Sequence, residues 1–489
     1  MKKKMIFIAI LLTIMSISVI YYNYTQTTKN IENNIKNEEI LNQSYAKITI
    51  NGEEILFFKN TPNDEPINLE TLNIEYDTIL NIETKDAEVK IGDKIIENIE
   101  YNIGKIKISN KNKIILHIKF LGEEEYKKYE INTLPSDFFQ YELEGEPNEN
   151  EEYYITFYDK VSSNSNYYIF KMNSKGEVTF FKKMSYYNNA FNFKKQIIND
   201  KTRYTYLETS NFEYEGLISS LPATLVVLNE KYEKINEIMY DKEKEIYADN
   251  HDYVYLDDNH YIICGYTKET VNNFPGSENK SIWNCRIKEV KDDKILWEFE
   301  SVKNKELYEY SNEVYNSDNA FDYMRFNSMD IDPNDGNLIC SFREIDAIIK
   351  ISRTNGKIIW VLGGKGDQFG LTEEQKFSTQ HSASMLKDNN ILLYDNGFED
   401  MNTRILKIKI DEKNKKIDEY FSYNIGSFFP MMGDVQAINE DKNTYLITYG
   451  MGAEDCAFEE INLKTAKSIF KFRILNGENV LYCVNKYKK

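Results

Sequence analysis

Short alternations of apolar and polar residues run through most of the chain. Between residues 44 and 133, segments such as YAKITI, EEILFF, KIKIS and IILHIKF alternate with turn clusters of Asn, Gly and Asp. Alternation with a period of two is typical of half-buried strands, and short strands separated by polar turns are typical of an antiparallel sandwich. We therefore predict a small β-sandwich domain over residues 44–135.

A longer unit repeats after this region. Six apolar strands are each followed by a hairpin, in which two alternating strands flank a turn of Asn, Asp, Lys or Gly. The steps between successive hairpins are 57, 57, 66, 57 and 52 residues, counted from Tyr167, Thr224, Ser281, Ala347, Arg404 and Cys456. Such a period indicates four-stranded units that bury their faces by stacking around a channel. We predict an all-β chain with a six-bladed β-propeller over residues 136–489, and two packed sandwiches are the alternative.

The N-terminus carries an export pattern. Three lysines at positions 2–4 precede an uncharged apolar run over residues 5–22. At about 1.5 Å per residue this run is roughly 27 Å long, which is enough to cross a hydrocarbon core with the following chain outside. Because apolar residues continue past the weak processing site at residues 16–18, we favour a signal anchor over a cleaved signal peptide. Residues 23–43 are a polar linker, and the expected location is extracytoplasmic, in the periplasm or at the cell surface.

Composition narrows the possible partners. With 79 acidic and 60 basic residues the formal charge is −19, which argues against a nucleic-acid-binding protein. The 37 tyrosines and 27 phenylalanines favour strands. The five cysteines are scattered without a CxxC pair, so we expect small buried hydrophobes and no disulfide framework.

The chain has four histidines, and two of them occupy equivalent positions in the repeat. His251 lies nine residues before the apolar strand that opens at His260, and His381 lies nine residues before the strand that opens at Asn390. His117 and His260 themselves fall inside predicted strands, where we expect a structural role. Repeat-equivalent residues at the start of an innermost strand line one mouth of a propeller channel. We therefore expect the side chains of His251 and His381 to converge.

Further polar residues fall at or near the same place in other blades. Asp434 lies nine residues before the strand at Asn443, Arg325 and Asn327 occupy the corresponding stretch of the fourth blade, and Arg343 ends the strand NLICSFR. Two imidazoles with two guanidiniums are a poor set of zinc ligands, because arginine repels a cation. They suit a sulfate or phosphate ester, whose oxygens a guanidinium binds while a neutral imidazole acts as nucleophile. The alternative is that these residues have no function, because a solvent-filled channel mouth tolerates any polar residue.

The residues around these positions resemble a known family. The segments 322–364, 377–397 and 432–450, with the QH pair at 380–381, resemble the bacterial arylsulfate sulfotransferases, secreted six-bladed propellers with a small N-terminal β-sandwich. The match is specific over about 320–450 and fainter over 135–300. The resemblance implies transfer of a sulfuryl group from an aryl sulfate to a phenol in two steps, without a nucleotide, metal or other cofactor.

The resemblance also implies roles for single residues. His381 would be the nucleophile that becomes a sulfohistidine, Arg343 and His251 would hold the sulfuryl oxygens, and Asn327 would help to orient the site, with Asp434 a further substrate-binding candidate. This chain has Arg325 where the family usually has a histidine that is a candidate proton donor to the leaving phenol. An arginine does not exchange protons near pH 7, although a guanidinium can stabilise a developing phenolate.

Two other functions remain open at this level. A non-catalytic propeller that binds an anionic or aromatic ligand or a partner protein is favoured by Arg325. A quinone-dependent propeller dehydrogenase is suggested by ISRTNGKIIW at 351–360, but three tryptophans are few for that group. The predicted partners of the enzyme are a small-molecule donor and acceptor, without nucleic acid, and the sequence leaves the oligomeric state open, a homodimer included.

Overall fold

The chain divides into two compact units, residues 1–136 and 137–489. The computed structural model describes residues 43–50, 53–63, 67–68, 79–91, 94–96, 102–107, 113–132, 134, 138–147, 150–159, 168–184, 188–210, 213–217, 220–272, 274–275, 279–311, 320–453, 456–475 and 479–488. The predicted signal segment and residues 23–42 of the predicted linker lie outside these ranges. No helix in the ranges is both long and apolar enough to cross a membrane.

The first unit contains two β-sheets. One has the order β2-β1-β4-β7, built from β1 (Tyr45–Ile50), β2 (Glu53–Phe58), β4 (Ile79–Lys85) and β7 (Asn102–Lys107). The other has the order β3-β9-β8-β5-β6, built from β3 (Ile67–Asn68), β5 (Ala87–Ile91), β6 (Lys94–Ile96), β8 (Lys113–Phe120) and β9 (Lys127–Asn132). Alternate apolar residues of both sheets meet in one core, which includes Ile48, Ile82, Val89 and Leu116. The two sheets therefore bury one face each against the other.

The described residues of the second unit form almost only antiparallel strands, which confirms the prediction of an all-β chain. The strands fall into groups of four. The first group combines β11 (Glu151–Asp159), β12 (Tyr168–Asn173) and β13 (Val178–Lys183) with the last strand, β34 (Asn479–Lys488). The second consists of β14 (Ala190–Ile198), β15 (Lys201–Thr209), β16 (Pro222–Leu228) and β17 (Lys234–Ile238). The third consists of β18 (Ala248–Asp257), β19 (His260–Val271), β20 (Lys280–Lys291) and β21 (Lys294–Glu300), and a short β16–β18 pairing joins it to the second.

Three more groups follow in chain order. The fourth contains β22 (Phe326–Ile331), β23 (Leu338–Phe342), β24 (Ala347–Ile351) and β25 (Ile358–Gly363). The fifth contains β26 (His381–Met385), β27 (Asn390–Asp395), β28 (Arg404–Asp411) and β29 (Lys416–Asn424). The sixth contains β30 (Asp434–Asn439), β31 (Thr444–Thr448), β32 (Phe458–Asn462) and β33 (Lys467–Ile474), with β10 (Tyr141–Gly145) added at its edge. The predicted repeat thus corresponds to successive four-strand groups.

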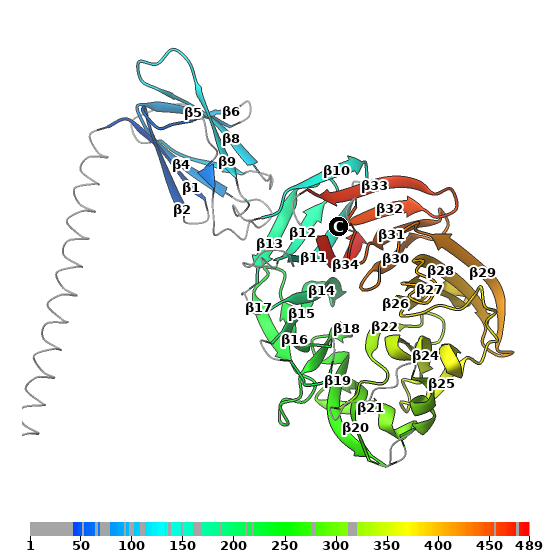
Figure 1. The fold of residues 1–489 in the computed structure, drawn as a ribbon. Helices are drawn as coiled ribbons and strands as arrows, with labels where there is room; N and C mark the ends of the chain where they lie inside the picture. The colour runs from blue at the N-terminus through cyan, green and yellow to red at the C-terminus, as the bar shows by residue number, and fades with distance from the viewer. Residues whose placement is uncertain are drawn as a thin grey trace, which may run out of the picture. The chain divides into compact units, whose positions relative to one another are not determined.

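One strand of each group faces a common centre, and we call these six the inner strands: β34, β14, β18, β22, β26 and β30. Figure 1 shows them around that centre, with the other strands of each group farther out. Each inner strand contacts the next one, and β30 contacts β34. Hydrogen bonds from or to side chains join each neighbouring pair: Asn485 to the Phe193 carbonyl, Asn192 to Asp252, the Met329 amide to Asp252, the Ala383 amide to Ser328, the Val435 amide to Ser382, and Gln436 to the Lys486 backbone.

Apolar side chains fill the space between consecutive groups. In one cluster Ile287 of the third group packs with Ile349 of the fourth, and in another Trp360 of the fourth packs with Leu406 of the fifth. Each group therefore buries both faces against its neighbours, which a four-stranded sheet cannot do alone. The five cysteines are free, and Cys340 lies in the first of these cores.

The last strand closes the first group, so its core contacts should matter for the whole unit. Leu481 of β34 is 1% exposed, and Leu475 outside it is 46% exposed. We expect Leu481→Ala to lower the free energy of unfolding by about 2–5 kcal/mol, because it leaves a cavity. The matched Leu475→Ala should change it by less than about 0.5 kcal/mol. Urea unfolding measures the free energy of unfolding of both variants. Equal losses in the two would contradict a stabilising role for the buried contacts of β34.

Candidate active site

The starts of the inner strands bring four of the predicted site residues to one cavity of about 710 Å³. His251 lies in β18, and His381 is the first residue of β26. Arg325 directly precedes β22, and Arg343 directly follows β23. Residues that are up to 130 positions apart in the sequence, from His251 to His381, therefore meet at one wall. We call this space the larger cavity.

The other two predicted residues lie elsewhere. Asn327 and Asp434 line a second cavity of about 340 Å³, which we call the smaller cavity. His251, His381 and Tyr482 line both cavities, so these three side chains separate them. Asn327 and Asp434 therefore lie on the opposite side of the imidazoles from the two arginines.

The ring of His381 is held in one tautomer. Its Nδ1 lies 2.6 Å from Asn396 Oδ1, while the Asn396 amide nitrogen donates to the backbone carbonyls of Phe429 and Met432. Because these two bonds fix which end of the amide is the nitrogen, the oxygen must accept a hydrogen bond from Nδ1–H. The Nε2 atom of His381 therefore carries a lone pair.

The surroundings of His381 also keep it uncharged. The residue is 7% exposed, and burial is the main cause that lowers the pKa of its imidazole to about 3. The neighbouring Arg343 and His251 lower this pKa further, and the hydrogen bond to Asn396 opposes them. A neutral ring with a free nitrogen is the form that a nucleophilic histidine requires.

The two arginines share one carboxylate. Nη1 of Arg343 lies 2.5 Å and Nη1 of Arg325 lies 2.9 Å from Glu344 Oε1. The backbone brings them together, because the Arg343 amide donates to the Arg325 carbonyl at 2.9 Å. The two guanidiniums share one carboxylate, and the buried carboxyl of Asp322, whose pKa burial raises to about 6, lies close to Arg325. Among the described residues, the buried Nε of Arg325 has no hydrogen-bond partner.

His251 has a carboxylate partner of its own. Nδ1 of His251 lies 2.9 Å from Asp249 Oδ1, and the His251 amide donates to the same oxygen at 2.8 Å. Asp249 is 2% exposed and lines neither cavity. The register of β18 against β19 shifts between Ala248 and Tyr253, so the backbone is irregular here, and the Asp249 carboxylate accepts from the amide two residues on, as in an Asx turn.

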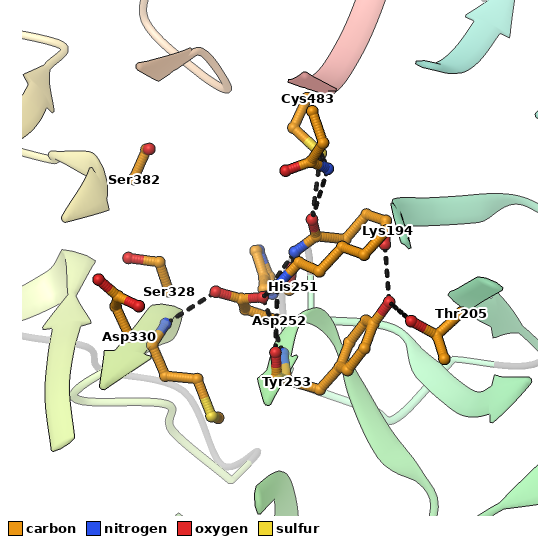
Figure 2. Close-up of polar contacts among 12 residues, drawn as sticks. Lys194, Thr205, His251, Asp252, Tyr253, Ser328, Asp330, Ser382 and Cys483 are labelled. Carbon is orange, nitrogen blue, oxygen red and sulfur yellow. Dashed lines mark hydrogen bonds and ion pairs between the residues drawn. The ribbon is translucent and has the colours of Figure 1, made fainter. Parts of the chain in front are cut away.

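The smaller cavity is polar. Asp434 accepts a hydrogen bond from Ser382 Oγ, and burial raises the pKa of the Asp434 carboxyl to about 6. Asn327 is 2% exposed, and its amide nitrogen has no hydrogen-bond partner among the residues that the structure describes. Lys194 reaches this cavity and binds Asp252 at 2.6 Å, as Figure 2 shows together with the neighbouring Ser328 and Asp330.

Neither cavity presents a metal site within the described part of the chain, where no group of three His, Cys, Asp or Glu side chains could hold an ion. What the larger cavity offers is a neutral imidazole beside two guanidiniums. This arrangement suits a tetrahedral oxyanion that can be transferred to nitrogen.

The family model described as Arylsulfotransferase (ASST) matches residues 148–482. The chain belongs to the arylsulfotransferase family. No curated protein matches it. Similar solved structures include a quinoprotein alcohol dehydrogenase-like protein from Bacteroides thetaiotaomicron, at 10% identity and a TM-score of 0.34, covering 90% of this chain and 98% of that one. A periplasmic gluconolactonase from Pseudomonas aeruginosa has 8% identity and a TM-score of 0.35, covering 68% of this chain and 99% of that one.

The lining of the larger cavity is largely apolar, which suits an arylsulfotransferase. The apolar side chains come from the second group, the sixth group, β34 and the loops beside these strands. They are Phe191, Tyr214, Leu217, Leu221, Met431, Met432, Met451 and Tyr482. A volume of about 710 Å³ falls within the usual range of small-molecule sites. Aromatic and thioether side chains pack well against a substrate ring.

Three residues of this arylsulfotransferase site were missed from the sequence: Asn396, Glu344 and Asp249. Asn396 ends the segment NILLYDN, Glu344 directly follows Arg343, and Asp249 lies two residues before His251. The i, i+2 spacing of Asp249 and His251 was a usable signal, because an aspartate carboxylate can accept a hydrogen bond from the backbone two residues on. Nothing in the sequence indicated that Asn396 contacts His381.

The lowered pKa of His381 predicts how stability depends on pH. As the pH falls below about 6.5, the unfolded chain takes up a proton at His381 while the folded chain does not, so acid destabilises the fold. We expect the stability advantage of wild type over His381→Asn to shrink by about 1.4 kcal/mol per pH unit, or about 2–3 kcal/mol by pH 4.5. Urea unfolding of both proteins at several pH values tests this, since the subtraction removes every other titrating group. Parallel curves would contradict a neutral His381.

Proposed function

We propose that this arylsulfotransferase moves a sulfuryl group from an aryl sulfate ester to a phenol through a sulfohistidine at Nε2 of His381. The observation that carries the proposal is the fixed tautomer of His381. Asn396 holds Nδ1–H at 2.6 Å, so the nucleophilic lone pair faces away from Asn396, and the residue lines the cavity that contains Arg343 and Arg325.

The first step forms a bond from His381 Nε2 to sulfur and breaks the bond from sulfur to the aryl oxygen. The phenolate leaves with the electron pair of the broken bond, and the sulfuryl group stays on the ring. In the second step an acceptor phenol oxygen attacks sulfur, the bond from sulfur to nitrogen breaks, and the phenol loses its proton. Neither step requires a nucleotide or a metal ion.

The guanidiniums supply the electrostatic part of this mechanism. Glu344 binds one Nη1 of each arginine, and the other N–H groups of the two guanidiniums would bind the sulfuryl oxygens. Because the side chains are held by Glu344 before substrate binds, little reorganisation is needed when charge develops on the oxygens. Arg325 lies where the family usually has a histidine, and its positive charge would stabilise the leaving phenolate rather than protonate it.

The finer architecture and the location are also proposals. We propose that the six four-strand groups form a closed six-bladed propeller preceded by a β-sandwich. The unbroken series of contacts between the inner strands and the pairing of β34 with β11 support closure. We also propose that residues 5–22 export and anchor the chain, on the strength of the apolar run after Lys2, Lys3 and Lys4.

A non-catalytic propeller that binds an anion is the second candidate. Arg325 favours it, because this residue removes the proton donor that the family resemblance implies at that position. The two functions differ in one observable. A binding protein releases the aryl sulfate unchanged, whereas the transferase keeps the sulfuryl group after the phenol has left.

The covalent intermediate can be weighed directly. Wild type treated with 4-nitrophenyl sulfate alone, digested without acid and analysed by mass spectrometry should show an adduct of about 80 Da on the peptide that contains His381. His381→Asn should lose both the adduct and turnover, while the control His117→Asn, in the other unit, should keep both. An adduct on another residue, or activity in His381→Asn, would refute the mechanism.

The geometry of the anion site is tested by Arg343→Lys. Lysine keeps the charge but loses the planar fork that binds two oxygens. We expect kcat/KM to fall about tenfold or more, which corresponds to about 1.4 kcal/mol. The exposed Arg473, 41% accessible in its ion pair with Glu144, provides the control Arg473→Lys, which should keep wild-type kinetics. Unchanged kinetics in Arg343→Lys would remove Arg343 from the site.

A further inference from the structure

The two steps proposed above need a group that carries a proton. The leaving phenolate gains a proton in the first step, and the acceptor phenol loses one in the second. The ionisable residues that line the larger cavity in the described part of the chain are His251, His381, Arg325, Arg343, Glu213, Glu215, Tyr214 and Tyr482. The carrier must be one that can hold and release a proton near neutral pH while His381 is occupied.

Most of these residues do not meet that condition. Guanidiniums stay protonated. Nε2 of His381 holds the sulfuryl group between the steps. Burial raises the pKa of Tyr482 well above its usual value, and it also raises the pKa of Tyr214. Glu213 and Glu215 are exposed. Glu344, behind the arginines, is bound to both guanidiniums. His251 is the remaining group.

The position of His251 fits a proton carrier. A carboxylate only accepts hydrogen bonds, so the contact of 2.9 Å with Asp249 places the proton on Nδ1 and leaves Nε2 to gain or lose one. The ring is 6% exposed and borders the larger cavity. It is close enough to His381 to lower the pKa of that imidazole. Asp249 orients the ring, and its charge offsets that of the imidazolium, as the aspartate does in a Ser-His-Asp triad.

We propose that His251 is the general acid and base of the reaction and that Asp249 is its positioning residue. In the first step Nε2–H of His251 protonates the leaving phenol oxygen, so the ring becomes neutral. In the second step the neutral Nε2 takes the proton of the acceptor phenol, so the imidazolium is restored. One proton thus passes from acceptor to donor, and the cycle consumes none. The assignment rests on the proposed function, and it gives His251 a role other than binding sulfuryl oxygens.

A comparison of two donors tests the assignment. The 4-nitrophenolate ion is a weak base and leaves without a proton, whereas phenolate is a strong base, comparable to a tyrosinate whose conjugate acid has a pKa of about 10. With one fixed acceptor, we expect His251→Asn to lower kcat/KM by about tenfold or less for 4-nitrophenyl sulfate and by about 100-fold or more for phenyl sulfate. The ratio of the two donors within one variant does not depend on the folded fraction.

The matched control is Arg343→Lys, which changes the binding of sulfuryl oxygens and no proton transfer. It should lower kcat/KM by the same factor for both donors. If His251→Asn also lowers both by one factor, His251 only binds oxygens and the assignment is wrong. Asp249→Asn keeps an oxygen for Nδ1–H but loses the charge, so its loss should be about tenfold greater for phenyl sulfate than for 4-nitrophenyl sulfate. Equal losses there would remove Asp249 from the proton path.

The outcome is separable from that of the proposed function. If wild type forms no His381 adduct and transfers nothing from 4-nitrophenyl sulfate, the transferase proposal itself fails. If wild type transfers the sulfuryl group but the donor ratio of His251→Asn equals that of wild type, only the proton role fails.

Discussion

The buried carboxylate of Asp252 ties three inner strands together at the centre of the second unit. It accepts hydrogen bonds from Asn192 and Lys194 of β14 at 2.6 Å each and from the Met329 amide of β22 at 2.9 Å. Figure 2 shows these contacts around β18, which carries Asp252 itself. A buried charge is tolerated only when its oxygens are satisfied, so these strands have to stay in register. Because His251 directly precedes Asp252, the same contacts place one wall of the candidate active site.

The site depends on local charges that differ sharply from the overall charge of −19. Arg325 and Arg343 bind the single carboxylate of Glu344, and the larger cavity is lined mostly by apolar side chains together with Glu213 and Glu215. On the other side of the histidines, the smaller cavity is lined by carboxylates, and burial raises the pKa of both Asp330 and Asp434 to about 6. The two guanidiniums therefore lie on the larger-cavity side of the imidazoles, and the buried carboxylates lie on the other side together with Lys194.

The two imidazoles show how partner chemistry separates residues of one type. His381 is paired with a neutral amide at Nδ1, and its burial and the nearby Arg343 keep it uncharged, as a nucleophile must be. His251 is paired with a carboxylate at Nδ1, which offsets the charge of a protonated ring. Both rings contact their partners through Nδ1, so Nε2 takes no part in these two contacts. The repeat places them at equivalent strand starts. Their different partners agree with the different steps of the proposed reaction that we assign to them.

Local patterns in the sequence were sufficient to predict the strands and the repeat, because alternation and period depend on neighbouring residues. The repeat in turn was sufficient to predict that His251, His381, Arg325 and Arg343 converge. The pairing of β34 with β11 joins segments more than 300 residues apart and was not predicted. Asn327 and Asp434 also share the repeat position, yet they face the smaller cavity, because the direction of a side chain depends on how the inner strands pack. The contacts of Asn396 with His381 and of Glu344 with both arginines arise only when the groups stack. The sequence by itself determined which residue types gather at the centre, and the tertiary structure decided which atoms are left free to react.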